Sequence, residues 1–88
     1  MKIWKFPLNE ERIKMPIGSW PLSVGLDPSG VPCIWCAVDD QEPGRWYRVI
    51  IAVTGGNTPN LDSVRFVGSF VHGDFVGHVY FDYNWSPA

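Results

Sequence analysis

Two cysteines at C-x-x-C spacing are the first residues in the chain that could do chemistry. Cys33 and Cys36 have the spacing found in zinc sites and in dithiol redox sites. A structural zinc ion needs four ligands, however, and the sequence has no second cysteine pair and no histidine near the first one. A redox pair would lie at the start of a helix, whereas residues 39–44 are typical of a turn. We therefore expect two buried, unreactive thiols and neither a metal nor a cofactor.

Three arginines that stand next to aromatic residues form a second candidate site. A guanidinium group can bind a phosphate while a base stacks on a neighbouring ring. Strand alternation puts Trp46 and Arg48 on one face. The alternative is that the arginines pair with Asp or Glu across strands. The sequence leaves both interpretations open for Arg45, Arg48 and Arg65.

A glycine pair that follows an apolar stretch marks the third candidate. Gly55-Gly56 resembles the start of a phosphate-binding loop, but neither nucleotide-binding glycine motif is completed and no helix pattern follows. The glycines can instead free backbone N–H groups beside three small polar side chains, those of Thr54, Asn57 and Thr58. This segment is either a ligand-binding loop or only a turn.

His78, Tyr80 and Asp82 alternate along a predicted strand and therefore share one face. A His–Asp pair suggests catalysis, but residues four apart on a strand are too distant for a direct hydrogen bond. No Ser or Cys has the setting of a nucleophile either. We therefore expect a protein that is not an enzyme, with His78 either in the wall of a binding site or in structural hydrogen bonds.

The pattern that must position these residues is β almost throughout. Polar and apolar residues alternate in short runs separated by Pro and Gly, and no stretch has a helical repeat of apolar residues. Residues 45–54 form the longest and most apolar run, so we place that strand centrally. Hairpin turns are expected at residues 27–30 and 72–74. The prediction is an all-β domain over residues 1–83, a small twisted antiparallel sheet or open barrel of six or seven strands, with at most one short helical turn between residues 57 and 64.

Length and composition restrict the class of protein. At 88 residues the chain is one domain with a thin core, and its five Trp, five Phe and three Tyr suit either burial or a subunit contact, so we expect a homo-oligomer. The net charge of −2 argues against a duplex nucleic-acid binder. No signal peptide and no long apolar run is seen, which predicts a cytoplasmic protein without a membrane partner. Residues 84–88 form a C-terminal extension, in which Trp85 is expected to dock at a subunit contact.

Several short motifs, in a fixed order over nearly the whole length, carry a family resemblance. The clearest are MKIWKF at 1–6, MPIG at 15–18, PCIWCAVD at 32–39, VTG at 53–55 and GHVYF at 77–81. With them the chain resembles a large family of short phage and bacterial proteins of unknown function. It departs from that pattern at Val53, where relatives often carry Gly, and in the extension beyond the usual end.

The resemblance implies no activity by itself, and a looser analogy supplies the functional expectation. Other small phage proteins act as sponges, homo-oligomers that bind a nucleotide-derived immune signal of the host, such as a cyclic dinucleotide or an ADP-ribose derivative. On that analogy we expect a non-enzymatic sponge in the host bacterial cytosol that evades anti-phage defence. The alternative is a phage inhibitor that blocks a host defence protein by direct contact. The expected ligand-binding residues are Trp35, which matches the C-x-W motif, Arg48, Thr54, Gly55, Gly56, Asn57, Thr58 and His78.

Overall fold

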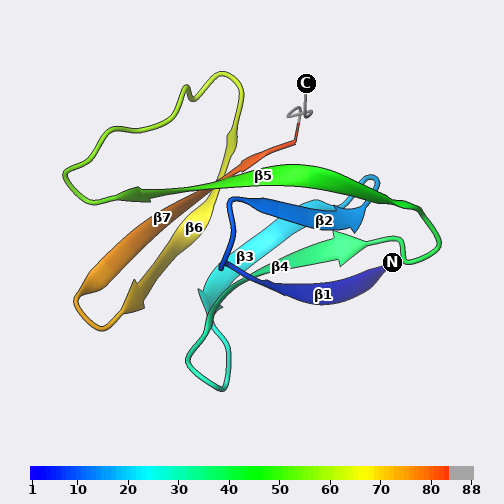
Figure 1. Cartoon of the computed structure of the whole chain (residues 1–88), viewed down its shortest axis with the longest axis horizontal. Helices are drawn as coiled ribbons and strands as arrows, with labels where there is room; N and C mark the ends of the chain where they lie inside the picture. The colour runs from blue at the N-terminus through cyan, green and yellow to red at the C-terminus, as the bar shows by residue number, and fades with distance from the viewer. Residues whose placement is uncertain (84–88) are drawn as a thin grey trace.

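The computed structural model describes residues 1–83, which form two antiparallel sheets of β-strands (Figure 1). The first sheet has the strand order β1 (Lys2–Pro7), β4 (Pro32–Val38) and β3 (Trp20–Leu26). The second sheet has the order β2 (Arg12–Pro16), β5 (Gly44–Val53), β7 (Phe75–Asp82) and β6 (Arg65–His72). These seven strands do not close into a barrel, and residues 1–83 contain no helix. The predicted all-β class is therefore confirmed, in an open arrangement.

The core lies between the two sheets. Along β4, Ile34, Cys36 and Val38 face the second sheet and are buried, because alternate residues of a strand point to the same side. The second sheet contributes Tyr47, Val49, Phe81 and other apolar side chains from its inner face. The sheets also meet along β3 and β6, where Gly68 lies close against Val24. Each sheet thus keeps one outer face, and these faces hold most of the candidate site residues.

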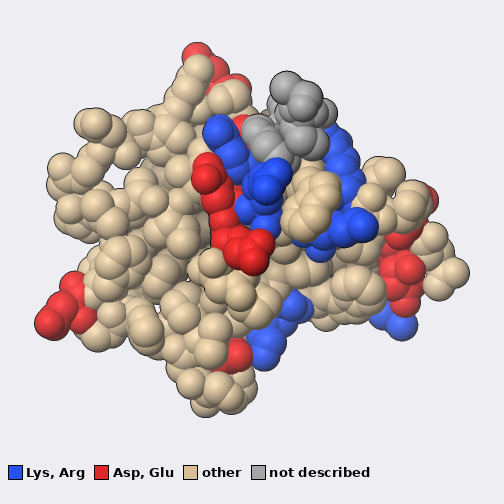
Figure 2. Space-filling model, viewed as in Figure 1, with Lys and Arg blue, Asp and Glu red and all other residues tan. Residues whose placement is uncertain are grey.

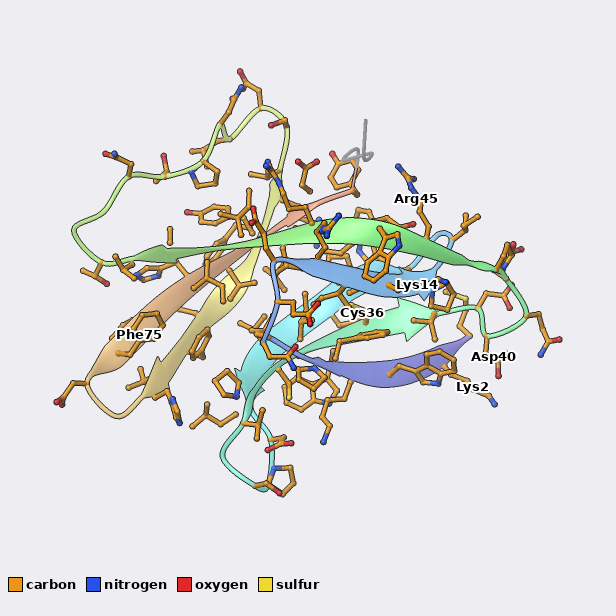
Figure 3. The ribbon with its side chains drawn as sticks, viewed as in Figure 1. Lys2, Lys14, Cys36, Asp40, Arg45 and Phe75 are labelled. Atoms are coloured by element: carbon orange, nitrogen blue, oxygen red, sulfur yellow. The ribbon has the colours of Figure 1, made fainter. Side chains whose placement is uncertain are left out.

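Both cysteines are free thiols and fully buried, as the sequence predicted. Cys36 points into the core, where its sulfur lies 4.0 Å from that of Met15 (Figure 3). Burial raises the pKa of Cys36 to about 12 and also raises that of Cys33. A thiol with so high a pKa is almost entirely protonated at neutral pH and is a poor nucleophile.

The predicted hairpins join the expected strands. Between β3 and β4, the Asp27 carboxylate accepts the backbone N–H groups of Ser29 and Val31, each at 2.9 Å, and Gly30 has a φ of 81° that favours glycine. Lys5 on β1 ties this turn to the sheet, since its Nζ lies 2.9 Å from Asp27 Oδ2. The β6–β7 turn contains Gly73, with a φ of 61°. Tight turns of this kind fix the strand register and hence which side chains share a face.

The segment between β5 and β6 is a loop. The short helical turn that the sequence allowed between residues 57 and 64 does not form. The Asn60 carbonyl oxygen accepts the backbone N–H of Ser63 at 3.2 Å, and its side chain accepts that of Asp62, which makes a local turn. Within residues 1–83, no helix has the length and apolar character needed to cross a membrane. The expected subunit contact of Trp85 lies outside the described residues.

Strand β5 is central, as predicted, but within residues 1–83 it is paired on both sides only where its two neighbours meet, at Arg48. It pairs with β2 from Gly44 to Arg48, and with β7 from Arg48 to Val53. One further hydrogen bond, from Val49 N–H to the Glu11 carbonyl oxygen at 2.8 Å, ends the contact on the β2 side. At the other end of the strand the Val53 carbonyl oxygen accepts the N–H of Gly56 at 2.9 Å, so within residues 1–83 the open edge on this side of β5 is confined to the short stretch between Val49 and Val53.

Candidate ligand-binding site

Four side chains on the outer face of the second sheet form what we call the basic face: Arg12, Lys14, Trp46 and Arg48. They come from β2 and the first half of β5, and the register sets Arg12 directly opposite Arg48 and Lys14 opposite Trp46. Their alternation partners, such as Ile13 and Tyr47, are buried in the core, so these four point away from it. Figure 2 shows Lys and Arg side chains gathered over this part of the sheet, with acidic groups along one flank.

The charges of the basic face are only partly balanced. Arginines directly opposite each other on adjacent strands repel, which costs stability. Arg48 is compensated on its other side, where its Nη2 lies 3.1 Å from Oδ2 of the buried Asp82. Among residues 1–83, no carboxylate oxygen lies within 4.0 Å of the Arg12 guanidinium or of Lys14 Nζ, whereas Lys2 and Lys5 are both paired. The face therefore presents two cationic groups without a carboxylate partner.

Aromatic rings lie close to the arginines of this face and of its surroundings. The Arg12 guanidinium carbon lies 5.8 Å from the centroid of the Trp46 ring, and 43% of Trp46 is exposed. Two further arginines stack on rings nearby, Arg45 on Tyr47 at 5.1 Å and Arg65 on Trp20 at 4.6 Å. Residues 1–83 thus contain three arginines within 6 Å of an aromatic ring centroid. Figure 3 shows Arg45 and Lys14 at the same end of the second sheet.

Arg48, the predicted phosphate ligand, is held in a cross-strand ion pair. This is the alternative that the sequence left open, since Arg48 lies directly opposite Asp82 on β7. Its Nε is buried and has no hydrogen-bond partner within residues 1–83. An unpaired buried donor costs free energy. Arg48 is thus fixed in place by Asp82, with one N–H group left to satisfy.

His78 lies on the same outer face, farther along the sheet, between two hydroxyl groups. Its Nε2 is 2.7 Å from Thr54 Oγ1, and its Nδ1 is 2.7 Å from Ser69 Oγ. Hydroxyl groups can donate or accept, so this arrangement satisfies either tautomer of a neutral ring. It joins the end of β5 to β6 across β7, and it gives His78 a structural role in addition to any ligand contact.

The predicted loop begins at the end of β5 and is exposed. Gly55 has a φ of 86°, and the N–H of Gly56 donates to the Val53 carbonyl oxygen at 2.9 Å, so that N–H group is used within the turn. Thr54 is six residues from Arg48 along β5, a distance of roughly 20 Å at about 3.3 Å per residue. Within one chain, therefore, Thr54 and His78 lie together, but Arg48 lies well away from Gly55, Gly56, Asn57 and Thr58.

Trp35 lies on the other sheet. Its neighbours Ile34 and Cys36 face the core, so the Trp35 side chain points to the outer face of the first sheet, where it packs over Gly25. The core of the protein therefore separates Trp35 from the basic face. A single chain does not bring it together with the other predicted residues.

The sequence reasoning did not identify Arg12 and Lys14 as site residues. Their signal was present, because they are the polar positions of a short alternating strand, with Ile13 and Met15 between them. What the sequence did not give was the partner of that strand. The pairing of β2 with β5 is what places Arg12 beside Arg48 and Trp46.

Comparison with known proteins identifies a family and no closer relative. Neither the curated proteins nor the solved structures gave a match. A family model described as a domain of unknown function, DUF7352, matches residues 1–87. The chain, with its open two-sheet fold and basic outer face, therefore belongs to the DUF7352 family.

Proposed function

We propose that this protein is a non-enzymatic binder of a phosphorylated, nucleotide-type ligand, and that the basic face holds the ligand. One observation carries the proposal: Arg12 lies directly opposite Arg48 and next to Trp46, on a solvent-facing sheet surface, in a chain whose net charge is −2. A like-charge pair at this position weakens the fold, and an anion bound between the two strands would relieve the repulsion.

The groups on this face match the two parts of a nucleotide. Guanidinium and ammonium groups bind phosphate oxygens through charge-assisted hydrogen bonds, and Arg12 and Lys14, which have no carboxylate partner among residues 1–83, supply them. An exposed indole supplies a flat apolar surface on which a base can stack, and Trp46 lies 5.8 Å from the Arg12 guanidinium and opposite Lys14 in the strand register. The Nε of Arg48 belongs to the same face, but it is buried and has no hydrogen-bond partner within residues 1–83, so it does not contact a ligand in this arrangement.

The proposal is that the protein binds its ligand and does not catalyse a reaction. The side chains of the basic face are cations and an indole, which supply charge-assisted hydrogen bonds and a stacking surface for a ligand. The carboxylate of Asp82, which lies opposite Arg48 on the neighbouring strand, is engaged by Arg48. Together with the resemblance to phage proteins, this favours a sponge that withholds a host nucleotide signal, a cyclic dinucleotide or an ADP-ribose derivative, from its effector.

A depletion experiment tests this function. The protein is incubated with cyclic dinucleotides and ADP-ribose derivatives and removed by filtration, and the ligand that remains free is measured. The retained fraction is then heat-denatured, and the released compound is identified by mass. A sponge depletes one of these ligands and returns it intact, whereas an enzyme returns an altered compound.

Matched variants locate the ligand on the basic face. Arg12→Ala and Lys14→Ala should each weaken binding by about 1.5–3 kcal/mol, the range for a hydrogen bond to a charged group. Lys2→Ala is the control, because it removes an exposed cation at the first sheet that is already paired with Asp40 at 2.8 Å. Equal binding by all three variants would refute the assignment of this face.

The alternative function, inhibition of a host defence protein by direct contact, rests on a different observation. Among residues 1–83, the tryptophans classed as exposed are Trp4 at 39%, Trp20 at 45% and Trp46 at 43%. Tryptophan is enriched among the residues that dominate protein interfaces. Failure of every nucleotide signal to be depleted, together with a stoichiometric complex with a purified defence protein, would favour this alternative.

A further inference from the structure

A second aromatic surface lies on the outer face of the second sheet, beside the basic face. The strand register sets Phe66 on β6 opposite Tyr80 on β7, and Tyr80 opposite Ile50 on β5. The sequence neighbours of Tyr80, which are Val79 and Phe81, are fully buried in the core. The Tyr80 side chain therefore points to the outer face, and its two cross-strand partners share that face. We call Ile50, Tyr80 and Phe66 the aromatic row.

The aromatic row is open to solvent. Phe66 is 54% exposed, more than Trp46 at 43%, and its ring centroid lies 5.3 Å from that of Tyr80. The outer faces of antiparallel sheets are usually polar, whereas the side chain of Phe66 has no group that can form a hydrogen bond with water. Two adjoining rings on such a face therefore offer an apolar surface on which a flat group can stack.

The two opposed arginines lie between the aromatic row and Trp46. Along β5, Trp46 precedes Arg48 by two residues and Ile50 follows it by two, so all three side chains share the outer face. Each step of two residues covers about 7 Å, at about 3.4 Å per residue. Arg12 lies directly opposite Arg48, so a group bound at Arg12 has an aromatic surface on either side of it.

A ligand with two bases fits this order of groups. In a dinucleotide each base is joined to the phosphates through a sugar, so the two bases flank the phosphates. We propose that the ligand of the basic face is a dinucleotide, whose phosphates lie at Arg12 and Lys14 and whose bases stack on Trp46 and on the aromatic row. A mononucleotide or ADP-ribose carries one base and would leave one of the two surfaces without a partner. This inference rests on the proposed function and selects the dinucleotide from the two ligand classes named there.

Neutral polar groups follow on the far side of the aromatic row. His78 precedes Tyr80 by two residues and lies opposite Ser69, on the same face. Its ring nitrogens lie 2.7 Å from Ser69 Oγ and 2.7 Å from Thr54 Oγ1. A hydroxyl group has one donor and two acceptor positions, so both hydroxyls keep hydrogen-bonding capacity beside His78. They lie at the far edge of a base that stacks on the aromatic row, where their neutral donors and acceptors match those of the base.

The site that results is elongated and runs along the strands. From Trp46 to Ala52, which lies opposite His78, it covers roughly 20 Å at about 3.4 Å per residue. Two bases with phosphates between them extend along this surface, whereas a compact anion occupies only the basic face. In this arrangement Arg48, Thr54 and His78 border one site, although they are separated along the sheet.

Calorimetric titration with matched probes tests the inference. The dinucleotides are cyclic di-AMP, cyclic di-GMP and the linear forms pApA and pGpG, and the one-base controls are AMP, GMP and ADP-ribose. At least one dinucleotide should bind at least tenfold more tightly than every one-base control. A smaller preference, or tighter binding of a one-base control, would overturn the dinucleotide and leave the proposed function standing. Binding of none of these probes would remove both.

Substitution of Phe66 tests the place of the second base. Phe66 lies outside the core, so Phe66→Ala should stay folded and weaken dinucleotide binding at least fivefold, because a stacking surface is lost. Phe66→Trp keeps a ring and should bind within a factor of two of the wild type. Val71→Ala is the matched control, since Val71 is 61% exposed on the same strand and face but lies five residues farther from the basic face. Equal dinucleotide binding by Phe66→Ala and Val71→Ala would overturn the role of the aromatic row.

Discussion

Arg48 and Asp82 lie directly opposite each other on β5 and β7, and the guanidinium Nη2 is 3.1 Å from the carboxylate Oδ2. Asp82 is buried, and Arg48 is half-buried. The charge of Asp82 is thus compensated by an arginine that also belongs to the basic face. Arg48 therefore contributes both to the stability of the fold and to the candidate site.

Removal of Arg48 should therefore destabilise the protein. In Arg48→Ala the Asp82 carboxylate remains buried without its partner, and leaving such a group unsatisfied costs about 1–3 kcal/mol. Urea unfolding followed by tryptophan fluorescence measures the change in the free energy of unfolding. Arg48→Lys keeps a positive charge near Asp82 and should lose less. An unchanged midpoint for Arg48→Ala would show that Asp82 does not depend on this arginine, and binding losses in this variant count only where it is folded.

Gly77 on β7 should not tolerate a methyl group. A Cβ at this position would lie 2.6 Å from Cε1 and 2.7 Å from Cζ of Phe70, a side chain packed in the core. Gly77→Ala forces Phe70 to move, and overpacking of this kind costs about 1–3 kcal/mol. Thermal unfolding by circular dichroism is the measurement.

Gly25→Ala is the control for Gly77. The nearest side-chain atom to its Cβ would be 3.9 Å away, on Trp35, which is an ordinary contact. This variant should unfold near the wild-type temperature. A second substitution, Phe70→Leu, should recover part of the stability that Gly77→Ala loses. A Gly77→Ala protein as stable as Gly25→Ala would contradict the packing of Phe70 over Gly77.

The turn at Asp27 should make stability depend on acid pH. The hydrogen bond from Lys5 and then that from the Val31 N–H lower the pKa of Asp27. A carboxyl group whose pKa is lower in the folded state stabilises the fold above its unfolded pKa of about 3.9, and this contribution is lost as the pH falls through the folded pKa. Asp27→Asn should therefore melt below the wild type at neutral pH, and the two melting temperatures should converge at low pH.

The converse holds for Lys5, since the same hydrogen bond raises its pKa. Its contribution is complete below its unfolded pKa and is lost only as the pH rises through the folded pKa. Acid therefore leaves the Lys5 charge in place and acts on Asp27. A constant difference in melting temperature between wild type and Asp27→Asn from neutral pH down to pH 2 would contradict this account.

The strands and hairpins could be predicted from the sequence, whereas the composition of the candidate site could not, and the reason is physical. Alternation, prolines and turn residues determine strands and hairpins, so the turns at Asp27 and Gly73 and the central place of β5 were predictable. The contact of β2 with β5 joins segments that no hairpin connects, and sequence alternation does not specify such partners. For that reason Arg48 and Trp46 were identified as neighbours, whereas Arg12 was not.

The same limit explains the division of the predicted ligand residues. Thr54 was grouped with Arg48 because the loop follows directly from the strand that carries Arg48, and His78 was added through its match to a family motif. A strand of ten residues is nevertheless long enough to keep its two ends apart. Trp35 was added through a motif, and motif order carries no information on which sheet a strand joins.

Substitution of Arg12 by glutamate separates the two roles of the basic face. Arg12 lies opposite Arg48, so Arg12→Glu replaces a repulsive cross-strand pair by an attractive one, and each such pair changes stability by about 0.2–1 kcal/mol. The loss of the contact with Trp46 costs about 0.5–1 kcal/mol at an exposed site, which offsets part of the gain. Because these terms are similar in size, we expect the free energy of unfolding to stay close to that of the wild type. Binding of a phosphorylated ligand should fall at least tenfold, because a cation that binds phosphate, worth about 1.5–3 kcal/mol, becomes an anion.

Lys2→Glu is the control for the change in net charge, and it should leave binding within a factor of two. A stable Arg12→Glu protein that binds the ligand like the wild type would exclude the basic face as the site, and a strongly destabilised one would show that Arg12 serves the fold instead.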